Sequence, residues 1–308
     1  MLIRMSTTRR GFFVQSAVAA SQLAGATSLL ANNAKDDFEP LFDGRSLAGW
    51  HAAPRISPLR GEVTSSAALD EFLTAQRRHK GLWRVRDGAI EGGQAGPRTI
   101  NPATGEEWGF GGWLMSDRVF GDFELRVDAK PDWPCDTGIY VRATEAGEGF
   151  QVLLDHRGDD QKGVGGGIGC LYLKGIGNFR VDPHNYRWSV GADGLPNGVR
   201  LIAGTDGVTR TEYSVTSDDF ASAWRMNDWN TFRVRVVGQL PRITTWINDV
   251  KICECDTQAI RAPNYDPEAV ASRLGPAGHI AFEVHDGPAN RWGVGKVCRW
   301  RNIMIRDL

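Results

Sequence analysis

The stretch GDFELRVDAKPDWPCDTGIYVRATEAGEGFQVLLD, residues 121–155, decides the fold. Apolar and polar residues alternate in three consecutive runs, at 123–128, 139–142 and 150–155. A period of two is typical of β-strands, and it places apolar side chains on one face of a sheet and polar or aromatic ones on the other. Such a sheet buries one face and leaves the other for a ligand. The stretch therefore predicts three strands with one free face.

Shorter strand patterns lie on both sides of this stretch. Two hairpin turns, Asp87-Gly88 and Asn248-Asp249, join alternating runs. Three more alternating runs lie at 232–236, 278–285 and 298–307. About a dozen short strands with little helix predict an all-β fold, a two-sheet antiparallel β-sandwich or jelly roll with long loop insertions and one or two short helices.

Three segments interrupt the strand pattern. The helical spacing of apolar residues predicts one short helix over residues 66–78. Residues 92–112 form a Gly/Pro-rich stretch that predicts a loop. Residues 156–225 predict a long functional loop with a single strand at 169–174. The glycine run at 163–167 lacks the lysine of a phosphate-binding loop, so no nucleotide is expected there.

The composition favours a carbohydrate ligand over a nucleic acid. The chain has 308 residues, is 41% hydrophobic and carries a formal net charge of −1, so it presents no general attraction for a polyanion. It contains 11 tryptophans. Exposed indole rings can stack on sugar rings, although tryptophan also fills large β cores.

The N-terminus resembles a twin-arginine export signal. Arg9-Arg10 precede a weakly apolar run at 17–30, which is too short and too rich in small residues for a stable membrane span. A chance arginine pair before an ordinary helix is the alternative. We expect residues 1–34 to be the signal peptide and residues 35–308 to form a single domain that acts in the periplasm or outside the cell.

The five cysteines form no recognisable metal-binding pattern. There is no Cys-x-x-Cys pair and no cysteine–histidine spacing of a zinc site. The number is odd, so the cysteines cannot all pair within one chain. We expect buried free thiols, with one disulfide as the alternative.

Several segments, taken in order, resemble the 3-keto-disaccharide hydrolase domain family, whose fold is a concanavalin A-like jelly roll. The resemblance covers about residues 41–308. Each motif alone is ordinary hairpin chemistry, but the ordered set is specific. The segments are LFDGRSLAGW (41–50), LWRVRDGAIEGG (82–93), FGDFELRVDAKPDWPCDTGIYVRA (120–143), WNTFRVRVVG (229–238), ITTWINDV (243–250), GHIAFEVHDG (278–287) and WRNIMIRDL (300–308).

The resemblance implies chemistry on glycosides that carry a ketone at C3. A base removes the acidified C2 proton, the glycosidic oxygen leaves by β-elimination, and water adds to the product, so that the net result is hydrolysis. Some members of the family are lyases or use a divalent metal ion. A sugar 3-dehydrogenase is the implied partner that supplies the substrate. A non-catalytic carbohydrate-binding module is the alternative, and the absence of an ExDxE run disfavours a retaining endoglycanase.

The chain departs from the family pattern at three places. Gln151 stands where the family has glutamate, and Leu153 where it has glutamine. After His285-Asp286-Gly287, the usually compact C-terminal motif is interrupted by an insertion at 288–297.

Five residues are candidates for the catalytic groups. Arg142 can hold a sugar hydroxyl or the enolate oxygen. Asp155 and His156 end the third strand and can act as a base. Glu283 and His285 share one face of a strand, which suits acid–base work. Asp155, His156 and His285 are also the candidate metal ligands, whereas solvated strand ends and surface ion pairs are the structural alternatives.

Six further residues are candidates for substrate binding because they are polar or aromatic residues on the strands. Tyr172 can stack on a sugar or donate a proton, and Glu124 is a second candidate base. Packing in the core or at a sheet edge is the alternative for each aromatic residue. The six are Gln151, Tyr172, Lys174, Glu124, Trp113 and Trp246.

Overall fold

The computed structural model describes most of the chain, and the contacts of Phe38–Leu308 form one compact unit. The predicted signal segment lies outside the described residues, so the signal stays a prediction. None of the described helices is long and apolar enough to cross a membrane. The described residues are 37–56, 66–156, 167–174, 180–181, 186–193, 195–201, 212–262 and 264–308.

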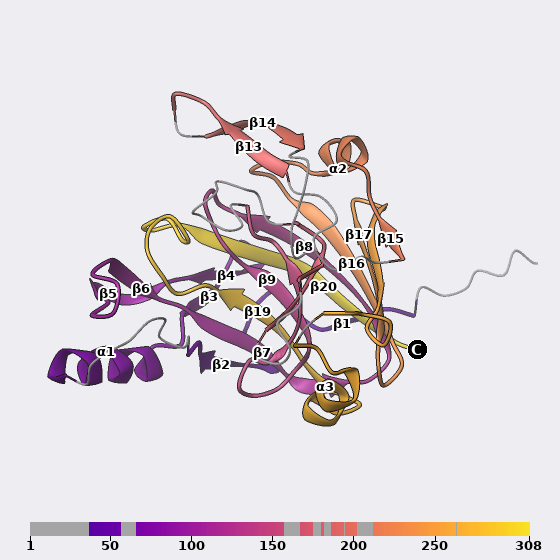
Figure 1. The fold of residues 1–308 in the computed structure, drawn as a ribbon, viewed down its shortest axis with the longest axis horizontal. Helices are drawn as coiled ribbons and strands as arrows, with labels where there is room; N and C mark the ends of the chain where they lie inside the picture. Colours follow the sequence, from indigo (N-terminus) through magenta and orange to yellow (C-terminus); the bar gives the residue numbers. More distant parts are fainter. Residues whose placement is uncertain are drawn as a thin grey trace, which may run out of the picture. The chain divides into compact units, whose positions relative to one another are not determined.

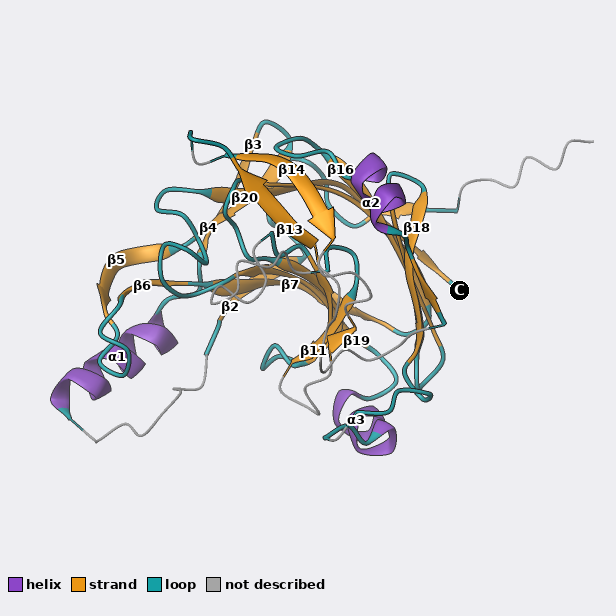
Figure 2. Ribbon diagram, turned by 45° about the horizontal axis from the view of Figure 1, so that its top comes forward, coloured by secondary structure: helices purple, strands orange, loops and turns teal. Residues whose placement is uncertain are grey.

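Two antiparallel sheets, paired face to face, confirm the predicted β-sandwich (Figures 1 and 2). Within the described residues, the larger sheet has nine strands in the order β15-β18-β17-β16-β8-β20-β4-β3, with β1 paired to β20. The nine are β1 (Glu39–Pro40), β3 (Leu82–Arg86), β4 (Ala89–Gly93), β8 (Phe123–Pro131), β15 (Tyr213–Ser214), β16 (Asn230–Val237), β17 (Arg242–Ile247), β18 (Val250–Asp256) and β20 (Val297–Asp307).

The smaller sheet carries the other two strands of the opening stretch. Its seven described strands run in the order β12-β11-β10-β9-β19-β7-β2, so β9 and β10 lie next to each other and β19 lies on the far side of β9. The seven are β2 (Trp50–Pro54), β7 (Gly112–Phe120), β9 (Gly138–Ala143), β10 (Gly149–Leu153), β11 (Leu171–Lys174), β12 (Arg180–Val181) and β19 (Gly278–Val284).

An aromatic column joins the two sheets through the core. Trp50 of β2 stacks on Phe282 of β19 at a ring-centroid distance of 5.3 Å, and Phe282 stacks on Trp300 of β20 at 4.9 Å. Trp83 of β3 packs against the far side of Trp300 at 5.7 Å. Because Phe282 and Trp300 come from different sheets and are fully buried, this contact fixes how the sheets face each other.

The predicted helix is confirmed as α1 (Ala67–Arg78), which begins at the cap residue Ser66, whose side chain accepts a hydrogen bond from the Leu69 amide. Two more helices, α2 (Ser217–Ala223) and α3 (Pro267–Leu274), bring the described total to three, one above the upper bound of the prediction. All five cysteines are buried and none forms a disulfide, as expected.

The predicted loop at 92–112 is wrong. It contains a hairpin of β5 (Ala95–Ile100) and β6 (Glu107–Phe110) that lies beside α1 (Figure 2). Phe72 of α1 contacts the rings of Trp108 and Phe110 at centroid distances of 6.0 and 5.8 Å. The hairpin is therefore stabilised by tertiary contacts with the helix, for which its sequence has no period-two signal.

The loop predicted at 156–225 is wrong in part. The strand predicted at 169–174 is confirmed as β11, but the segment also contains a second hairpin, β13 (Tyr186–Val190) with β14 (Pro196–Leu201), together with β15 and α2. Glycine and proline lie in and beside these short strands, which hides them from a search for alternation.

The aromatic column predicts a large loss of stability on truncation of Trp300. Replacing Trp300 with alanine should lower the free energy of unfolding by about 3–5 kcal/mol, because it leaves a cavity between the sheets. The matched control is Trp246→Ala on the outer face of β17, which should cost less than about 1 kcal/mol. Urea unfolding followed by circular dichroism measures both, and equal losses would contradict this account of the core.

Candidate functional site

Polar side chains gather on the outer face of the smaller sheet. Gln151 of β10 lies opposite Tyr140 of β9, and Glu283 of β19 lies one strand further along. Gln151 Nε2 donates to Glu283 Oε2 at 2.9 Å, and the Tyr140 hydroxyl donates to Gln151 Oε1 at 2.8 Å. The neighbouring residues in sequence point into the core, so the alternation in the sequence places these three groups together.

A buried arginine joins these polar side chains to the end of β19. Arg55 follows β2; its Nε lies 2.5 Å from Glu283 Oε1 and its Nη1 pairs with Asp286. Gln76 of α1 donates to Asp286 Oδ2 at 3.3 Å. Burial opposes the charge on Arg55, but the carboxylates of Asp286 and Glu283 outweigh it and raise the arginine pKa. We call Arg55, Gln76, Tyr140, Gln151, Glu283 and Asp286 the Arg55 network.

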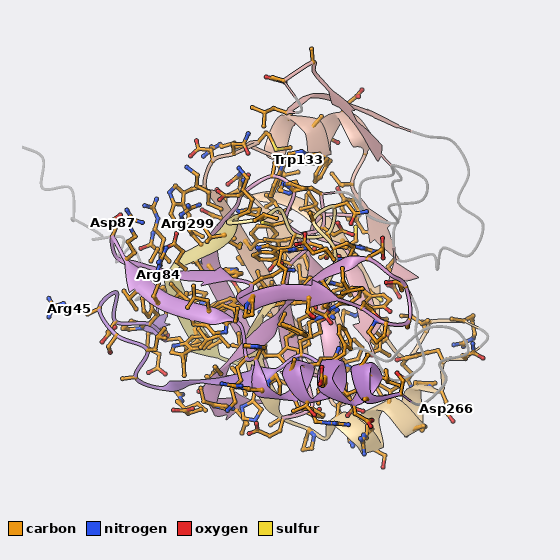
Figure 3. The ribbon with its side chains drawn as sticks, turned by 90° about the vertical axis from the view of Figure 1, so that its left-hand side faces the viewer. Arg45, Arg84, Asp87, Trp133, Asp266 and Arg299 are labelled. Carbon is orange, nitrogen blue, oxygen red and sulfur yellow. The ribbon has the colours of Figure 1, made fainter. Side chains whose placement is uncertain are left out.

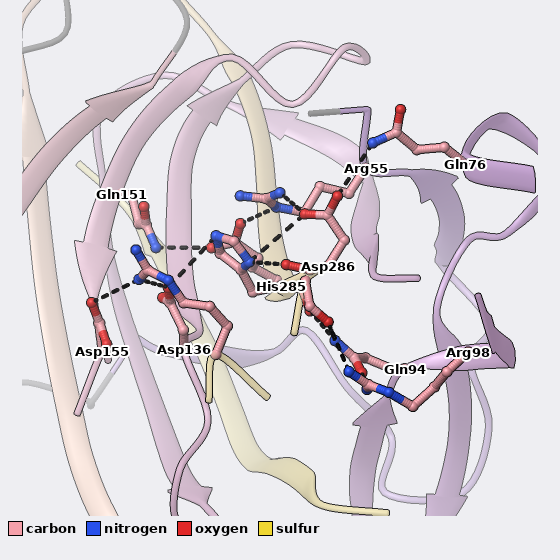
Figure 4. Close-up of polar contacts among 12 residues, drawn as sticks. Arg55, Gln76, Gln94, Arg98, Asp136, Gln151, Asp155, His285 and Asp286 are labelled. Atoms are coloured by element: carbon pink, nitrogen blue, oxygen red, sulfur yellow. Dashed lines mark hydrogen bonds and ion pairs between the residues drawn. The ribbon is translucent and has the colours of Figure 1, made fainter. Parts of the chain in front are cut away.

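His285 stands between the Arg55 network and a second acidic group (Figure 4). Its Nδ1 hydrogen-bonds to the carbonyl oxygen of Asp286, which can only accept, so Nδ1 carries the proton. Nε2 lies 3.5 Å from Oδ2 of Asp136. The imidazole side chain is 21% exposed, whereas that of Glu283 is 1% exposed. His285 is therefore the member of this group that can both reach a ligand and exchange a proton with a carboxyl group.

Asp136 has the environment of an acid–base group. Burial raises its pKa well above the usual range, the charge of Asp155 raises it further, and Arg291 opposes the shift. Arg291 Nη1 lies 2.6 Å from Asp136 Oδ2 and 3.6 Å from Asp155 Oδ2. A buried carboxyl group with a raised pKa beside an imidazole is suited to proton transfer. We call Asp136, Asp155, His285 and Arg291 the proton-transfer cluster.

Sequence reasoning missed six of the ten residues that form the Arg55 network and the proton-transfer cluster, namely Arg55, Gln76, Asp136, Tyr140, Asp286 and Arg291. Asp136 lies two residues before Gly138 and four before Tyr140, so the same alternation that selected Gln151 could have found it. Arg55, Gln76 and Arg291 carry no such signal, because they come from a strand end, a helix and the 288–297 insertion.

Three further sequence candidates lie on the smaller sheet around the cluster. Tyr172 of β11 pairs with Gln151 and is partly exposed, so it can contact a ligand. Trp113 is 1% exposed, pairs with Glu283 between β7 and β19, and packs edge-on against Tyr140 at 4.5 Å, so it lies beside the polar side chains on the same face. Lys174 pairs with Gly149 along the backbone, and its side chain lies outside the described atoms.

His156 lies next to the cluster but is completely buried. Its ring packs between Trp133 and Trp224, at centroid distances of 5.5 and 5.6 Å. Burial lowers the pKa of His156 to about 4, although the charge of Asp155 opposes this. A neutral, fully buried imidazole cannot touch a substrate in this conformation, so His156 serves as packing behind Asp155.

The structure does not bring Arg142, Glu124 or Trp246 to this site. Arg142 has a φ of 53°, and its guanidinium donates to backbone carbonyls, among them those of Gly121 and Pro276. Glu124 and Trp246 belong to the larger sheet, on its outer face, where both contact Arg233. Alternation identifies an outer face but not the sheet to which it belongs.

The predicted metal ligands do not converge. Among the described side chains, no group of three or more histidine, cysteine, aspartate or glutamate residues could hold a metal ion. The guanidinium of Arg291 lies against the carboxylates of both Asp136 and Asp155, and His156 faces tryptophan rings. The described residues therefore do not fit a bound divalent cation at this place.

The low pKa of His156 predicts acid-sensitive stability. Because the folded pKa is about 4 and the ordinary value is 6.5, the unfolded chain binds the proton first as the pH falls. Stability should therefore decline between pH 6.5 and pH 4, by up to about 3 kcal/mol for this residue. Urea unfolding at several pH values tests this: His156→Phe should remove that part of the decline, and an identical decline in the variant would refute it.

The contacts of Arg142 predict a role in stability rather than catalysis. Arg142→Met removes a buried guanidinium and leaves several partly buried carbonyls without their donor, which should lower the free energy of unfolding by about 2 kcal/mol or more. The exposed Arg118→Met is the control and should cost less than about 0.5 kcal/mol. A loss of turnover in Arg142→Met without a loss of stability would return this residue to the catalytic candidates.

Comparison with known proteins places this site within a family. No curated protein matches the chain. Two solved structures from Parabacteroides distasonis ATCC 8503, each described as a putative glycosyl hydrolase, match 88% and 74% of this chain and 94% and 90% of their own. They are 13% and 18% identical, with TM-scores of 0.42 and 0.39. A carbohydrate-binding module from Bacillus subtilis is 10% identical, with 74% and 92% coverage and a TM-score of 0.36.

The family itself is shown by a sequence model rather than by these structures. The model of the 3-keto-alpha-glucoside-1,2-lyase-like domain matches residues 37–306. The match includes both sheets, the Arg55 network and the proton-transfer cluster. The chain therefore belongs to the 3-keto-alpha-glucoside-1,2-lyase-like domain family.

Proposed function

We propose that this protein is an enzyme that cleaves the glycosidic bond of 3-keto-glycosides, including 3-keto-disaccharides. The observation that carries the proposal is the Asp136–His285 pair, a partly exposed imidazole 3.5 Å from a carboxyl group of raised pKa, in a domain of this family. From the twin-arginine pattern, we further propose that the reaction occurs in the periplasm or outside the cell. Its substrates would be sugars already oxidised by a 3-dehydrogenase.

The ketone at C3 determines what the protein must do. A base takes the proton from C2, and the electron pair of that bond forms an enolate with its negative charge on the C3 oxygen. The enolate then re-forms the ketone and expels the C1 oxygen, so that C1 and C2 become doubly bonded and the leaving oxygen takes up a proton. Addition of water across that double bond completes a net hydrolysis. Omission of the last step makes the enzyme a lyase.

His285 is the proposed base at C2. Its Nδ1 proton is held by the Asp286 carbonyl, which leaves the Nε2 lone pair to accept the C2 proton. Asp136, next to Nε2, stabilises the imidazolium that forms and relays the proton towards the leaving oxygen.

The Arg55 network supports the base without entering the reaction. Glu283 and Asp286 flank His285 in sequence, and Arg55 holds both carboxylates in place. From the other side, Gln94 Nε2 donates to the carbonyl oxygen of His285 at 3.0 Å. The backbone that carries the imidazole is therefore fixed at several points, which favours a single orientation for proton transfer.

Isotope incorporation provides the test. In D₂O, the protein should release the leaving sugar from a 3-keto-disaccharide and place one deuterium at C2 of the hydrated product. His285→Gln and Asp136→Asn should each lower kcat/KM by roughly 10²–10⁴-fold, while Glu254→Gln on the larger sheet should stay within about twofold. Mass spectrometry and a protein-free control measure the exchange.

The same experiment separates the proposal from its alternative. Sugar binding without turnover on any 3-keto-glycoside would overturn it in favour of a non-catalytic carbohydrate-binding module. Full activity in His285→Gln would overturn the assignment of the base.

A further inference from the structure

Arg291 belongs to the 288–297 insertion. Backbone hydrogen bonds join this insertion to the segment that contains Asp136. The amide of Asp136 donates to the carbonyl of Arg291 at 2.9 Å, and the amide of Gly293 donates to the carbonyl of Pro134 at 3.1 Å. Trp292 is fully buried between them. The insertion is therefore held against residues 132–137, and Arg291 starts from a fixed backbone position.

The guanidinium occupies the place where the acidic groups of the cluster meet. Asp136 precedes β9 and Asp155 follows β10, and Nη1 of Arg291 contacts one carboxylate oxygen of each, at 2.6 and 3.6 Å. Both carboxylate side chains are less than a tenth exposed, whereas that of Arg291 is 26% exposed. Carboxylate oxygens are ligands that divalent cations use, but here a side-chain cation lies against both carboxylates.

We propose that Arg291 is the cation of this active site, in place of a divalent metal ion. The inference rests on the proposed function and deepens it by naming the group that stabilises the enolate oxygen. A guanidinium is always charged and offers several donors in one plane, and the side chains of both Arg291 and His285 are partly exposed to solvent. A fixed positive charge where negative charge develops lowers the barrier to removal of the C2 proton.

Arg291 also compensates the negative charge of the two carboxylates. Burial and the charge of Asp155 raise the pKa of Asp136, and Arg291 opposes that rise. Without Arg291, the acid limb of the pH–rate profile should therefore move to higher pH. A residue that only supports the loop would leave this limb in place, so the profile distinguishes the two roles.

Metal titration tests the inference without relying on turnover. At about pH 8, Arg291→Ala should bind Mn²⁺ at least roughly tenfold more tightly than the unsubstituted protein, because it leaves the carboxylates of Asp136 and Asp155 without the positive charge between them. Arg291→Lys keeps the charge and should bind no more tightly than the unsubstituted protein. Calorimetry and electron paramagnetic resonance follow the binding, and circular dichroism verifies folding. Tight, stoichiometric Mn²⁺ binding by the unsubstituted protein would overturn the inference.

Measurements of turnover form the second part of the test. Chelator should leave the unsubstituted protein fully active, whereas Arg291→Ala should lose roughly 10²–10³-fold in kcat and recover part of it with guanidinium or Mn²⁺. Arg299→Ala is the matched control, since Arg299 bridges Asp132 and Glu91 on the larger sheet, near Arg84 (Figure 3). It should keep its activity, with no response to chelator.

The two failures can be told apart. An unsubstituted protein without turnover refutes the proposed function, and the Mn²⁺ titration then still decides whether Arg291 holds the place of a cation. An active protein that chelator inactivates, or an Arg291→Ala variant with unchanged kcat and pH profile, refutes the inference alone.

Discussion

Arg55 places a positive charge between the carboxylates of Glu283 and Asp286, and all three side chains are almost completely shielded from solvent. Taking such charges out of water is costly, and each is tolerated only while the others remain in place. The pairing ties the end of β2 to the end of β19, and Gln76 adds α1 to the same group. The position of His285 depends on this arrangement, since His285 lies between the two carboxylates in sequence.

The site therefore has two layers with different duties. The charged members of the Arg55 network are almost completely buried, so they are poorly placed to exchange protons with a ligand. The proton-transfer cluster lies beside it, where His285 and Arg291 reach solvent. Separating rigid support from reactive groups lets the protein keep an unusual carboxyl group such as Asp136 without exposing the charges that orient it.

Alternation in the sequence predicted the sandwich and part of the site, because the period of a strand assigns each residue to a face. Gln151 and Glu283 were found this way, and Asp136 could have been. Alternation does not say which of two sheets a strand joins, so Glu124 was misleading. It also fails where the backbone leaves the extended region, as at Arg142. Positions set by contacts between distant segments, such as the β5–β6 hairpin and the insertion, have no local signal at all.

The backbone bonds between residues 132–137 and the insertion have a consequence for local unfolding. Segments joined in this way open as one cooperative unit, and amide hydrogen exchange would report a shared protection for both. An opening fluctuation thus withdraws Asp136 and Arg291 from His285 at the same moment. In the proposed reaction, such a transition would lead directly from an assembled site to a dismantled one, without a state that creates the enolate in the absence of the proposed stabilising charge.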